Sequence, residues 1–527
     1  MTRYDVIVVG AGPAGLSAAI EAKKRGMRVA VFDENERPGG QLFKQIHKFF
    51  GSKEHQAKIR GFKIGEKLLQ EATELDVNVY LQSTVMGLYQ DKEVTVKSVD
   101  QIRHYKGDTV IVATGASENM VMFDGWTLPG VIGAGAAQTM LNLHGLCPGK
   151  RVLMLGSGNV GLVVGFQLLQ CGCEIAAVVD AAHRIGGYGV HAAKLTRAGI
   201  PFYLPYTILK AEGTDHVTGV TIGRVDSSWN IVPGSEKHFD VDTICLAVGL
   251  SPMSQLVKMA GCRMEDDPKK GGQVPVADEY GETSVSGLFV CGDVSGIEEA
   301  SSAMIKGKIA GVSAAHALGF LEDEEKAEEI DTLKKSLESL RQGMFAPQNR
   351  GKTVRVTEEG LPVSATLLEK GFLTDEEAGI YPGTLQKHGI HPVIECTQNI
   401  PCNPCQDVCP KGCIRIGEKI TSLPAVEDDS ICSGCGLCVA SCPGQAIFLV
   451  NADYAPGFAS VTIPYEFLPR PAKGEKGVGL GRDGATLCPV EILEMREAAP
   501  FDHTSLVTLR VPAPFAEKVR FYRKGEV

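Results

Sequence analysis

The sequence has no basic tract and no long acidic tail, although its 63 Asp and Glu residues outnumber its 53 Lys and Arg residues. Nucleic-acid-binding domains usually concentrate Lys and Arg on one face, so a net charge of −10 gives no support for a nucleic-acid partner. The remaining composition, 44% apolar and 22% charged, is typical of a soluble globular protein, and 527 residues are enough for two to four domains.

The sequence also lacks a recognisable signal peptide and a convincing membrane span. It opens with MTRYDVIVVG, so an apolar strand begins at once. Residues 152–173 form an uncharged run of 22 residues, which is long enough to cross a bilayer. The run contains GSGNVG, however, and a strand–turn–helix explains it better than a transmembrane helix. We therefore expect no transmembrane segment and a cytoplasmic location.

Cysteine is sparse outside one region, because nine of the sixteen cysteines lie between Cys396 and Cys442. Such clustering indicates metal binding rather than a disulfide framework spread through a small secreted domain. No CxxC pair occurs before residue 402, and Cys171-Gly172-Cys173 lies in an apolar stretch where buried packing is expected. Dithiol exchange of the CxxC type is therefore not expected, and the setting should be reducing.

The N-terminal residues carry a dinucleotide-binding pattern. YDVIVVGAGPAGLSAAIEAKKRGMRVAVFDE predicts a strand, the turn Gly10-x-Gly12-x-x-Gly15, a helix, and a second strand that ends at Asp33. Gly10 permits a tight turn, Gly12 lets the backbone approach a pyrophosphate, and Gly15 lets helix and strand pack closely. The helix N-terminus adds unpaired N–H groups, and a carboxylate at Asp33 would accept ribose hydroxyls.

The same pattern recurs in KRVLMLGSGNVGLVVGFQLLQCGCEIAAVVD, where Gly156, Gly158 and Gly161 are followed by Asp180. Two patterns predict two dinucleotide sites. A carboxylate at Asp180 would repel the 2′-phosphate of NADP, so NAD is the expected second ligand. NADP stays open as an alternative, because a His and an Arg follow at residues 183–184 and could serve a phosphate.

Further motifs give these patterns a family context. They are PGGQL at 38–42, ATG at 113–115, LAVGLSP at 246–252 and GLFVCGDV at 287–294. With them the chain resembles the two-dinucleotide-binding flavoprotein oxidoreductases, the group that includes thioredoxin reductase and the glutamate synthase small subunit. The resemblance implies an α/β fold with two Rossmann-like domains. In it, the FAD-binding domain, residues 1–118 and 275–325, is split by an NAD(P)-binding insert at residues 119–274.

The resemblance also implies which residues contact the dinucleotides, with Asp293 hydrogen-bonded to the ribityl phosphate region of the flavin. The implied FAD contacts are Gly10, Gly12, Pro13, Ala14, Gly15, Asp33, Glu34, Gly40, Gln41, Val85, Ala113, Thr114, Gly115, Gly292, Asp293 and Ala300. The implied NAD contacts are Gly156, Gly158, Asn159, Gly161 and Asp180. No Ser/His/Asp or acid–base constellation stands out, so no catalytic side chain is assigned.

The cysteine-rich region contains a complete bacterial ferredoxin run. In ICSGCGLCVASCPGQAI, Cys432, Cys435, Cys438 and Cys442 are separated by two, two and three residues and are followed by Pro443. In ferredoxins with this run, the first three cysteines hold one [4Fe–4S] cluster and the fourth reaches across to a second cluster. A partner run is therefore required.

CTQNIPCNPCQDVCP supplies that partner as the first half of an internal repeat. Each of Cys402, Cys405 and Cys409 lies 33 residues before its counterpart in the second run. Cys396 lies 36 residues before Cys432, so the first half carries three extra residues between its first two cysteines. A longer turn in the first half would still let Cys396 reach a cluster.

This repeat predicts two [4Fe–4S] clusters. One would be held by Cys396, Cys402, Cys405 and Cys442, and the other by Cys409, Cys432, Cys435 and Cys438. Two alternatives remain: a single cluster, or a zinc ion bound by Cys402, Cys405, Cys409 and Cys413. Cys413 falls opposite Ala446 in the repeat, which favours a small buried residue over a ligand.

The remaining segments carry no recognisable chemistry. Residues 326–390 are expected to form a helical linker or bracing segment before a ferredoxin-like module at 391–452. Strand patterns and Gly-rich turns in residues 453–527 predict a small β-domain. Residues 44–63 are locally basic with two adjacent phenylalanines, so a solvated loop or helix is the simplest expectation. Lining the flavin or docking a partner subunit is the alternative role for that stretch.

Two further stretches carry a narrower resemblance. GWTLPGVIGAGAAQTML at 125–141 and IGGYGVHAAKLTRAGIP at 185–201 are similar to nucleotide-binding subunits of opine oxidase, hydrogen cyanide synthase and heteromeric sarcosine oxidase, and of dye-linked proline dehydrogenases. In those enzymes a separate amino-acid-oxidase-type flavoprotein subunit oxidises a C–N bond. The resemblance implies a hetero-oligomer with such a flavoprotein and, as a further partner, a small iron–sulfur subunit.

Together these features predict the NAD-linked electron-transfer subunit of an amino-acid or amine dehydrogenase, carrying FAD, NAD and two [4Fe–4S] clusters. FAD would convert between two-electron nicotinamide and one-electron clusters. One alternative is a free-standing NAD(P)H:ferredoxin or NAD(P)H:acceptor oxidoreductase resembling the glutamate synthase small subunit. The other is a non-catalytic cluster scaffold within a larger complex.

Overall fold

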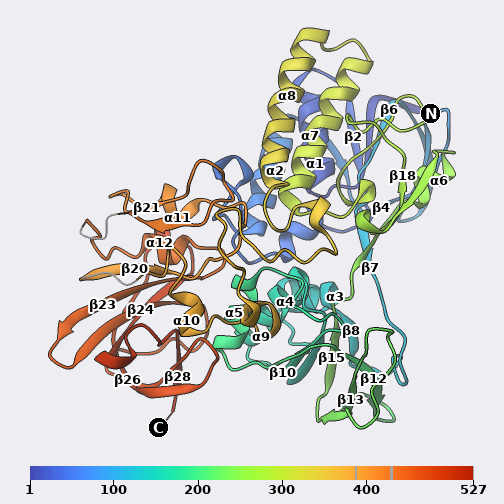
Figure 1. Ribbon diagram of the computed structural model, residues 1–527. Coiled ribbons are helices and arrows are strands. Elements are labelled where there is room, and N and C mark those ends of the chain that lie inside the picture. Colours follow the sequence, from blue (N-terminus) through green and yellow to red (C-terminus); the bar gives the residue numbers. More distant parts are fainter. Residues whose placement is uncertain (386–388, 428–430, 526–527) are drawn as a thin grey trace. The chain divides into compact units, whose positions relative to one another are not determined.

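The structure is a computed structural model that describes residues 1–385, 389–427 and 431–525. The chain divides into two compact units (Figure 1). Unit 1 consists of residues 1–47, 54–119 and 249–341. Unit 2 consists of residues 48–53, 120–248 and 342–527. Each unit therefore contains segments that are far apart in the sequence.

Unit 1 is built on a mostly parallel sheet whose central strands are continuous apolar runs, as is typical of strands buried on both faces. The strand order is β3-β2-β1-β6-β5-β4, and β19 pairs with β6. Strands β4 and β5 are antiparallel additions to an otherwise parallel sheet. The bounds are β1 (Thr2–Val9), β2 (Val29–Phe32), β3 (Asn78–Tyr80), β4 (Ser83–Leu88), β5 (Glu93–Ser98), β6 (Gln101–Val112) and β19 (Leu288–Val290).

Helices α1 (Pro13–Lys24) and α7 (Ala300–Ala317) pack closely because small residues line their contact. A Cβ atom added at Gly307 would lie 2.1 Å from the backbone oxygen of Ala14, so no larger residue fits between the two helices. Helix α8 (Asp323–Leu340) packs on α7 through buried Ile330 and Leu337, and the three helices lie together in Figure 1. The other helices of unit 1 are α2 (Gly61–Glu74) and α6 (Gln255–Met259).

The chain leaves unit 1 and returns to it through a short antiparallel pair, β7 (Ala116–Glu118) with β16 (Leu250–Pro252). The sequence placed the return near residue 275, whereas residues 249–274 already belong to unit 1. Residues 249–274 join unit 1 through the hydrogen-bonded β7–β16 pair and a second hairpin, β17 (Met264–Asp267) with β18 (Gly272–Pro275). The sequence did not predict these short strands, because none of them is an apolar run of strand length.

Unit 2 contains a second Rossmann-like fold with a five-stranded parallel sheet in the order β11-β10-β9-β15-β8. Its strands are β8 (Val131–Gly133), β9 (Arg151–Leu155), β10 (Glu174–Val179), β11 (Phe202–Tyr203) and β15 (Thr243–Leu246), and its helices are α3 (Ala134–Gln138), α4 (Asn159–Gln170) and α5 (Gly189–Arg197). A small antiparallel sheet follows, formed by β12 (Tyr206–Glu212), β13 (Gly219–Arg224) and β14 (Lys237–Phe239).

The uncharged run at residues 152–173 is divided between β9 and α4, as the strand–turn–helix interpretation predicted. Among the residues that the structure describes, none of the helices combines the length and the apolar character that a bilayer crossing needs.

The C-terminal part of unit 2 is a seven-stranded antiparallel sheet in the order β20-β23-β24-β27-β26-β25-β28. Its strands are β20 (Ile390–Ile394), β23 (Ile447–Ala455), β24 (Phe458–Tyr465), β25 (Lys476–Leu480), β26 (Thr486–Arg496), β27 (Ser505–Pro512) and β28 (Phe521–Lys524). Strands β20 and β23 enclose the cysteine-rich segment, so that segment and residues 453–527 share one sheet.

Short elements complete the cysteine-rich segment and the stretch before it. They are α9 (Ala365–Lys370), α10 (Asp375–Ala378), α11 (Pro404–Asp407), β21 (Ile414–Arg415), β22 (Ala425–Val426) and α12 (Leu437–Ser441). An apolar cluster that includes Ile414, Val439 and Ile447 packs against the cysteines. Burial of these side chains contributes on the order of 1.5–3 kcal/mol each, so the cysteine-rich segment has a core of its own.

The close approach of α1 and α7 can be tested by replacing Gly307 with Ala. The added methyl group would overlap the backbone of Ala14, and overpacking of this kind costs about 1–3 kcal/mol. We expect hydrogen–deuterium exchange of the amides in α1 and α7 to accelerate accordingly.

The matched control is Gly165→Ala in α4, where a Cβ atom would meet only Leu195 side-chain atoms at 3.6 and 3.7 Å. This variant should leave exchange in α4 unchanged or slower, because Ala favours a helix by about 1 kcal/mol over Gly. Equal exchange in wild-type protein and Gly307→Ala would contradict the packing described.

Candidate functional site

The first glycine-rich turn lies between β1 and α1 in unit 1 and is shaped by close backbone contacts. Gly10 has a φ of +102°, and a Cβ atom at Gly15 would lie 1.9 Å from the Gly10 oxygen. Around the would-be Cβ of Gly12 there is no heavy atom within 4 Å among the described residues. The turn therefore leaves open space at the N-terminus of α1, where unpaired N–H groups and the helix dipole favour a phosphate.

Asp33 fixes this turn from the end of β2. Its buried carboxylate accepts a hydrogen bond from the Ala11 N–H at 2.6 Å and from the backbone and side-chain nitrogens of Asn35, both at 2.8 Å. The sequence predicted that Asp33 binds a ribose. In the structure the Asp33 carboxylate also holds the turn in place, through its hydrogen bonds to Ala11 and Asn35. Each carboxylate oxygen has two lone pairs, so Asp33 retains the capacity to accept a ribose hydroxyl. The neighbouring Glu34 is exposed.

Several other residues implied for FAD meet at the same turn. The Gly39 N–H donates to the Ala11 oxygen at 2.6 Å, and a Cβ atom at Gly40 would lie 2.9 Å from the Gly12 Cα. Ala113 adjoins Gly10, while a Cβ atom at Gly292 would lie 2.8 Å from the Ala14 Cβ. The turn is thus surrounded by three segments from different parts of the chain.

The other residues implied for FAD also belong to unit 1. Thr114 Oγ1 donates to the Met253 oxygen at 2.7 Å, and Asp293 Oδ1 accepts from the Glu298 N–H at 3.2 Å. Gln41 is exposed in a short helix, Val85 is half-buried in β4, and Ala300 is the first residue of α7.

The second glycine-rich turn, between β9 and α4 in unit 2, has the same pattern of close contacts and hydrogen bonds as the first. A Cβ atom at Gly161 would lie 2.1 Å from the Gly156 oxygen, and the space around Gly158 is open. Asp180 Oδ2 accepts from both the N–H and the hydroxyl of Ser157 at 2.7 Å, as Asp33 accepts from Ala11. In both turns, therefore, a carboxylate accepts a hydrogen bond from a backbone N–H of the turn, and the N-terminus of the following helix is accessible.

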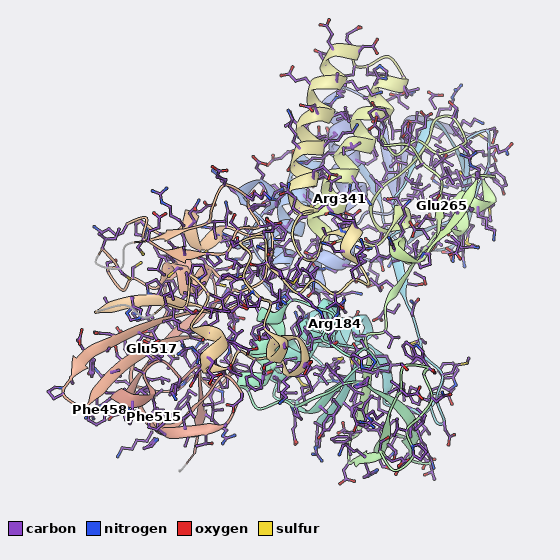
Figure 2. The ribbon with its side chains drawn as sticks, in the orientation of Figure 1. Arg184, Glu265, Arg341, Phe458, Phe515 and Glu517 are labelled. Carbon is purple, nitrogen blue, oxygen red and sulfur yellow. A yellow bond between two sulfur atoms is a disulfide. The ribbon has the colours of Figure 1, made fainter. Side chains whose placement is uncertain are left out.

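The loop that begins with residues 183–184 and continues into the 185–201 stretch covers part of the second turn, a position that the sequence did not predict. The Gly187 N–H donates to the Ser157 oxygen at 2.8 Å, and the Tyr188 N–H donates to Asn159 Oδ1 at 2.8 Å. Arg184, labelled in Figure 2, donates to the Lys352 backbone oxygen. A signal was available: each Asp is followed four residues later by an Arg, and then by a Gly-Gly pair at residues 39–40 and 186–187.

The first cysteine group consists of Cys396, Cys402, Cys405 and Cys442, which line one cavity. The rest of the lining is almost entirely apolar and includes Phe50, Val190, Ile394, Ile400 and Ile447. Burial and the neighbouring thiols raise the pKa of Cys396 and Cys402 well above the usual value, and that of Cys405 to about 12.

Four thiols that line one apolar cavity fit the ligand set of a thiolate-bound iron–sulfur cluster. Metal binding would displace the thiol protons, because thiolates and not thiols are the ligands. The extra three residues before Cys402 therefore do not keep Cys396 away from its group, and Cys396 lines the same cavity as the other three.

The second cysteine group contains Cys409, Cys432, Cys435 and Cys438 together with Cys413. Cys413 is buried, as expected, but its sulfur lies 3.4 Å from the Cys409 sulfur rather than in simple apolar packing. Burial and the Cys409 thiol raise the pKa of Cys413 to about 12. The zinc alternative requires Cys402, Cys405, Cys409 and Cys413 to converge, whereas the structure divides them between the two groups.

The locally basic stretch expected as a solvated loop is partly buried. The Lys48 ammonium donates to the Ala440 and Phe501 oxygens at 2.6 and 2.7 Å and to Thr504 Oγ1 at 2.9 Å. Phe50 lines the cavity of the first cysteine group and contacts Tyr188 edge to face. We call residues 48–53 the strap. Through Phe50 the strap forms part of the cavity wall, which sequence composition alone did not reveal.

One cysteine expectation needs correction outside these groups. Cys171 is not a packing residue, because it forms a disulfide with Cys147. Cys173 is buried, as expected, and its thiol donates to the Gly149 oxygen at 3.2 Å. The sequence did not predict this disulfide, because Cys147 lies 24 residues before Cys171, with β9 and α4 between them.

Two known families match parts of the chain. The pyridine nucleotide-disulphide oxidoreductase family matches residues 4–319, and the 4Fe-4S binding domain family matches residues 425–448. The first match covers both glycine-rich turns, and the second covers the complete ferredoxin run. FAD and NAD(P) binding and a 4Fe–4S segment follow at the level of family.

Several known proteins are similar to the chain, and two are described here as examples. An opine oxidase subunit of Rhizobium meliloti is 30% identical over 336 residues, 60% of this chain and 64% of the relative. Hydrogen cyanide synthase subunit HcnB of Pseudomonas aeruginosa is 27% identical over 331 residues, 58% of this chain and 70% of the relative. This chain therefore spans less than two thirds of the opine oxidase subunit.

Among solved structures, thioredoxin reductase of T. acidophilum aligns with a TM-score of 0.50 and 21% identity, over 60% of this chain and 100% of that chain. At that identity the match supports the fold alone. The chain is an oxidoreductase of this fold, and its relatives are named as subunits of larger enzymes.

The strap can be tested with Lys48→Met. Removing the ammonium takes one donor from each of three buried oxygens, although the Phe501 oxygen still accepts from the Thr504 N–H, and the loss costs about 1–3 kcal/mol. We expect faster hydrogen–deuterium exchange and faster proteolysis at residues 48–53, together with faster exchange in α12. The exposed neighbour Lys53 supplies the control. Lys53→Met should behave like wild-type protein, and a Lys48→Met variant that matched it would show that the contacts do not hold the strap.

Proposed function

The chain belongs to the pyridine nucleotide-disulphide oxidoreductase family, and from that premise we propose that it is the NAD-linked electron-transfer flavoprotein subunit of a heteromeric amino-acid or amine dehydrogenase. The observation that carries the proposal is the occurrence in one chain of two dinucleotide turns and two cysteine groups. Nicotinamide exchanges two electrons and iron–sulfur clusters exchange one, so a flavin is the required converter.

FAD is assigned to unit 1 and NAD to the second turn in unit 2. The residues around Gly12 leave room for a pyrophosphate at α1, and the Gly39–Gly40 segment borders that space. At the second turn, Asp180 presents a carboxylate at the end of β10, where a ribose 2′-phosphate would be repelled. Arg184 is occupied with the Lys352 oxygen and His183 is exposed, which supports NAD over NADP.

Two [4Fe–4S] clusters are assigned to the two cysteine groups. Cys396, Cys402, Cys405 and Cys442 would hold the first, and Cys409, Cys432, Cys435 and Cys438 the second. The chain's contribution is to bury the sulfurs, to place them in two groups, and to exclude water with the strap and the apolar lining.

The amino acid or amine would bind to a partner subunit. In the part of the chain that the structure describes, the cavity that contains the cysteines is lined mainly by apolar residues and offers no carboxylate or amine recognition. The relatives' names describe them as subunits, which supports a hetero-oligomer. As partners we propose an amino-acid-oxidase-type flavoprotein and a small iron–sulfur subunit. We place this assembly in the cytoplasm.

The proposal is tested by anaerobic purification from the native source with identification of co-purifying chains. A second flavoprotein subunit, together with bleaching of the flavin by NADH, is the expected result. Bleaching without a partner would favour a free-standing NAD(P)H:acceptor oxidoreductase. A flavin that NADH does not bleach would overturn the electron-transfer role and leave a cluster scaffold.

The preference for NAD is tested with Asp180→Asn. The amide keeps an acceptor for Ser157 but removes the charge that would repel a 2′-phosphate. We expect the ratio of kcat/KM for NADH to that for NADPH to fall about tenfold, equivalent to about 1.4 kcal/mol. Asp215→Asn, an exposed carboxylate in the same unit, should leave the ratio unchanged. An unchanged ratio in Asp180→Asn would remove Asp180 from nucleotide selection.

The number of clusters is tested by counting iron and sulfide. Wild-type protein should hold about eight iron atoms per chain, and Cys396→Ala or Cys435→Ala about four, because each removes a ligand of one [4Fe–4S] cluster. Cys488→Ala, a buried cysteine of β26 outside both groups, should retain the wild-type content. About four iron atoms in the wild-type protein would reject the two-cluster assignment.

A further inference from the structure

Three cysteines of the nucleotide-binding fold in unit 2 lie together and belong to neither cysteine group. They are Cys147, Cys171 and Cys173, and their Sγ atoms all lie within 4.8 Å of one another. Cys147 and Cys171 are joined in the disulfide, whereas Cys173 carries a free thiol. We call these three residues the cysteine triplet. The proposed function assigns no part to them.

The end of helix α4 fixes the positions of Cys171 and Cys173. Cys171 is the C-cap residue of the helix, and Gly172 follows it with a φ of +93°. The Gly172 N–H donates to the Leu169 oxygen and the Cys173 N–H to the Leu168 oxygen, both at 3.0 Å. This is the hydrogen-bond pattern of a Schellman turn, in which glycine takes the left-handed position. The CxC spacing is therefore part of a well-defined helix end.

Cys147 comes from the loop before β9, and that loop is anchored independently of the disulfide. The Lys150 N–H donates to both carboxylate oxygens of Asp242, at 3.1 and 2.9 Å. The Gly149 oxygen accepts from the Cys173 thiol at 3.2 Å, which joins the loop to the helix end. Backbone contacts thus hold the two segments together, so the three sulfurs stay close when the disulfide is opened.

The cysteine triplet is accessible from one side. Cys147 is exposed, Cys171 is half-buried, and Cys173 is only 5% exposed. In a reducing setting, an exposed disulfide sulfur is open to attack by small thiols. Reduction converts Cys147 and Cys171 into two thiols, so the reduced protein has three thiols at this place, with Cys173 on the buried side.

Three thiolates at this spacing suit a single zinc ion. Zn–S bonds of about 2.3 Å at tetrahedral angles place the sulfurs about 3.8 Å apart, which is inside the observed 4.8 Å. The nearby carboxylates have other partners, since Asp242 accepts from the loop N–H groups and Glu174 pairs with Arg151 at 3.0 Å. Water from the exposed side is then the natural fourth ligand.

We propose that the reduced cysteine triplet binds one Zn²⁺ ion through three thiolates and a water molecule, and that the Cys147–Cys171 disulfide is the oxidised, metal-free form of this site. A small disulfide such as oxidised glutathione interconverts the two forms. Its S–S bond breaks as it takes two electrons from the Cys147 and Cys171 thiolates, whose own S–S bond forms. With two protons it becomes two molecules of glutathione, and the Cys173 thiolate takes up a third proton as zinc leaves.

The experiment uses the full chain, purified anaerobically with its flavin and clusters and reduced with a phosphine. After dialysis against Zn²⁺, zinc, iron and flavin are measured in the same sample. Wild-type protein should retain about one zinc ion more per chain than Cys173→Ser, with equal iron and flavin. X-ray absorption at the zinc edge should give three sulfur neighbours at about 2.3 Å and one oxygen at about 2.0 Å. Oxidised glutathione should release the ion.

The variants Cys147→Ser and Cys171→Ser should lose the ion as Cys173→Ser does. The matched control is Cys488→Ala, because Cys488 is a buried free cysteine of β26 outside the cysteine triplet. It should retain the wild-type zinc content. Cys396→Ala should also retain it, because Cys396 belongs to the first cysteine group.

Equal zinc in wild-type protein and all three serine variants would show an adventitious ion only and overturn the inference. So would a zinc spectrum with four sulfur neighbours, or loss of zinc in Cys396→Ala but not in Cys173→Ser. If a serine variant loses iron and flavin together with zinc, misfolding is the cause and the wild-type zinc spectrum decides. The inference is independent of the proposed function, because a flavin that NADH does not bleach changes neither the zinc content nor this spectrum.

Discussion

The burial of the Cys396, Cys402, Cys405 and Cys442 sulfurs in one apolar cavity is the constraint on which the rest of unit 2 depends. Thiolates can be kept away from water only if other charge balances them and if the surrounding backbone is fixed. The strap contributes Phe50 to the lining of the cavity, and helix α5 contributes Val190. The C-terminal sheet supplies Arg482 and Arg520. Segments far apart in sequence therefore meet because the sulfur site needs all of them.

The second dinucleotide turn is coupled to the same site through one short loop. Gly187 and Tyr188 hydrogen-bond to the turn, and the next residues, Gly189 and Val190, contact Gln398 and the cavity. A nucleotide at α4 and a cluster in the cavity would thus share a rigid support. That arrangement would suit the proposed electron-transfer role, because potentials and distances set by packing do not depend on side-chain proton transfer.

Local patterns were sufficient to predict both glycine-rich turns and the 33-residue cysteine repeat, since each depends on residues close in sequence. They did not predict that Asp33 and Asp180 also hold the turns through hydrogen bonds. They were not sufficient for Lys48, whose three acceptors lie about 400 residues away and give no local signal. Composition predicted a solvated loop where the fold provides buried oxygens. The contact between the Cys413 and Cys409 sulfurs was not predicted either. Aligning the two halves of the repeat compares positions in the sequence and gives no distances between side chains.

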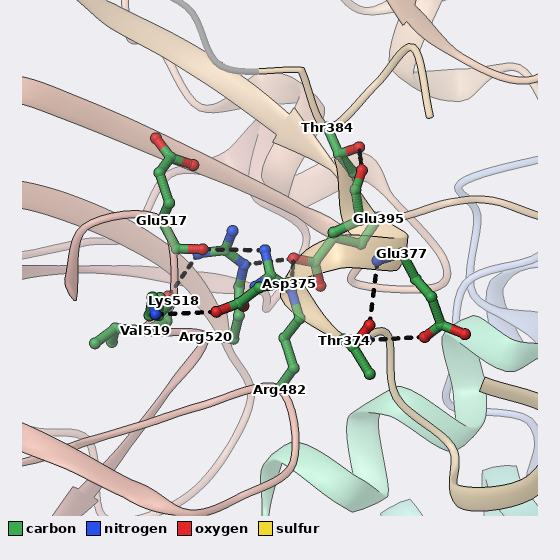
Figure 3. Close-up of polar contacts among 11 residues, drawn as sticks. Thr374, Asp375, Glu377, Thr384, Glu395, Arg482, Glu517, Lys518, Val519 and Arg520 are labelled. Atoms are coloured by element: carbon green, nitrogen blue, oxygen red, sulfur yellow. Dashed lines mark hydrogen bonds and ion pairs between the residues drawn. The ribbon is translucent and has the colours of Figure 1, made fainter. Parts of the chain in front are cut away.

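The buried arginines show the limit of sequence reasoning most clearly. Arg197 lies in a helix of the nucleotide-binding fold, while Arg482 and Arg520 lie in loops of the C-terminal sheet, and an isolated arginine in any of these segments is normally a surface residue. All three are buried, and Glu395 accepts hydrogen bonds from Arg482 at 2.7 Å and from Arg520 at 2.6 Å (Figure 3). These ion pairs join segments that are far apart in the sequence, so they follow from the fold and give no local signal.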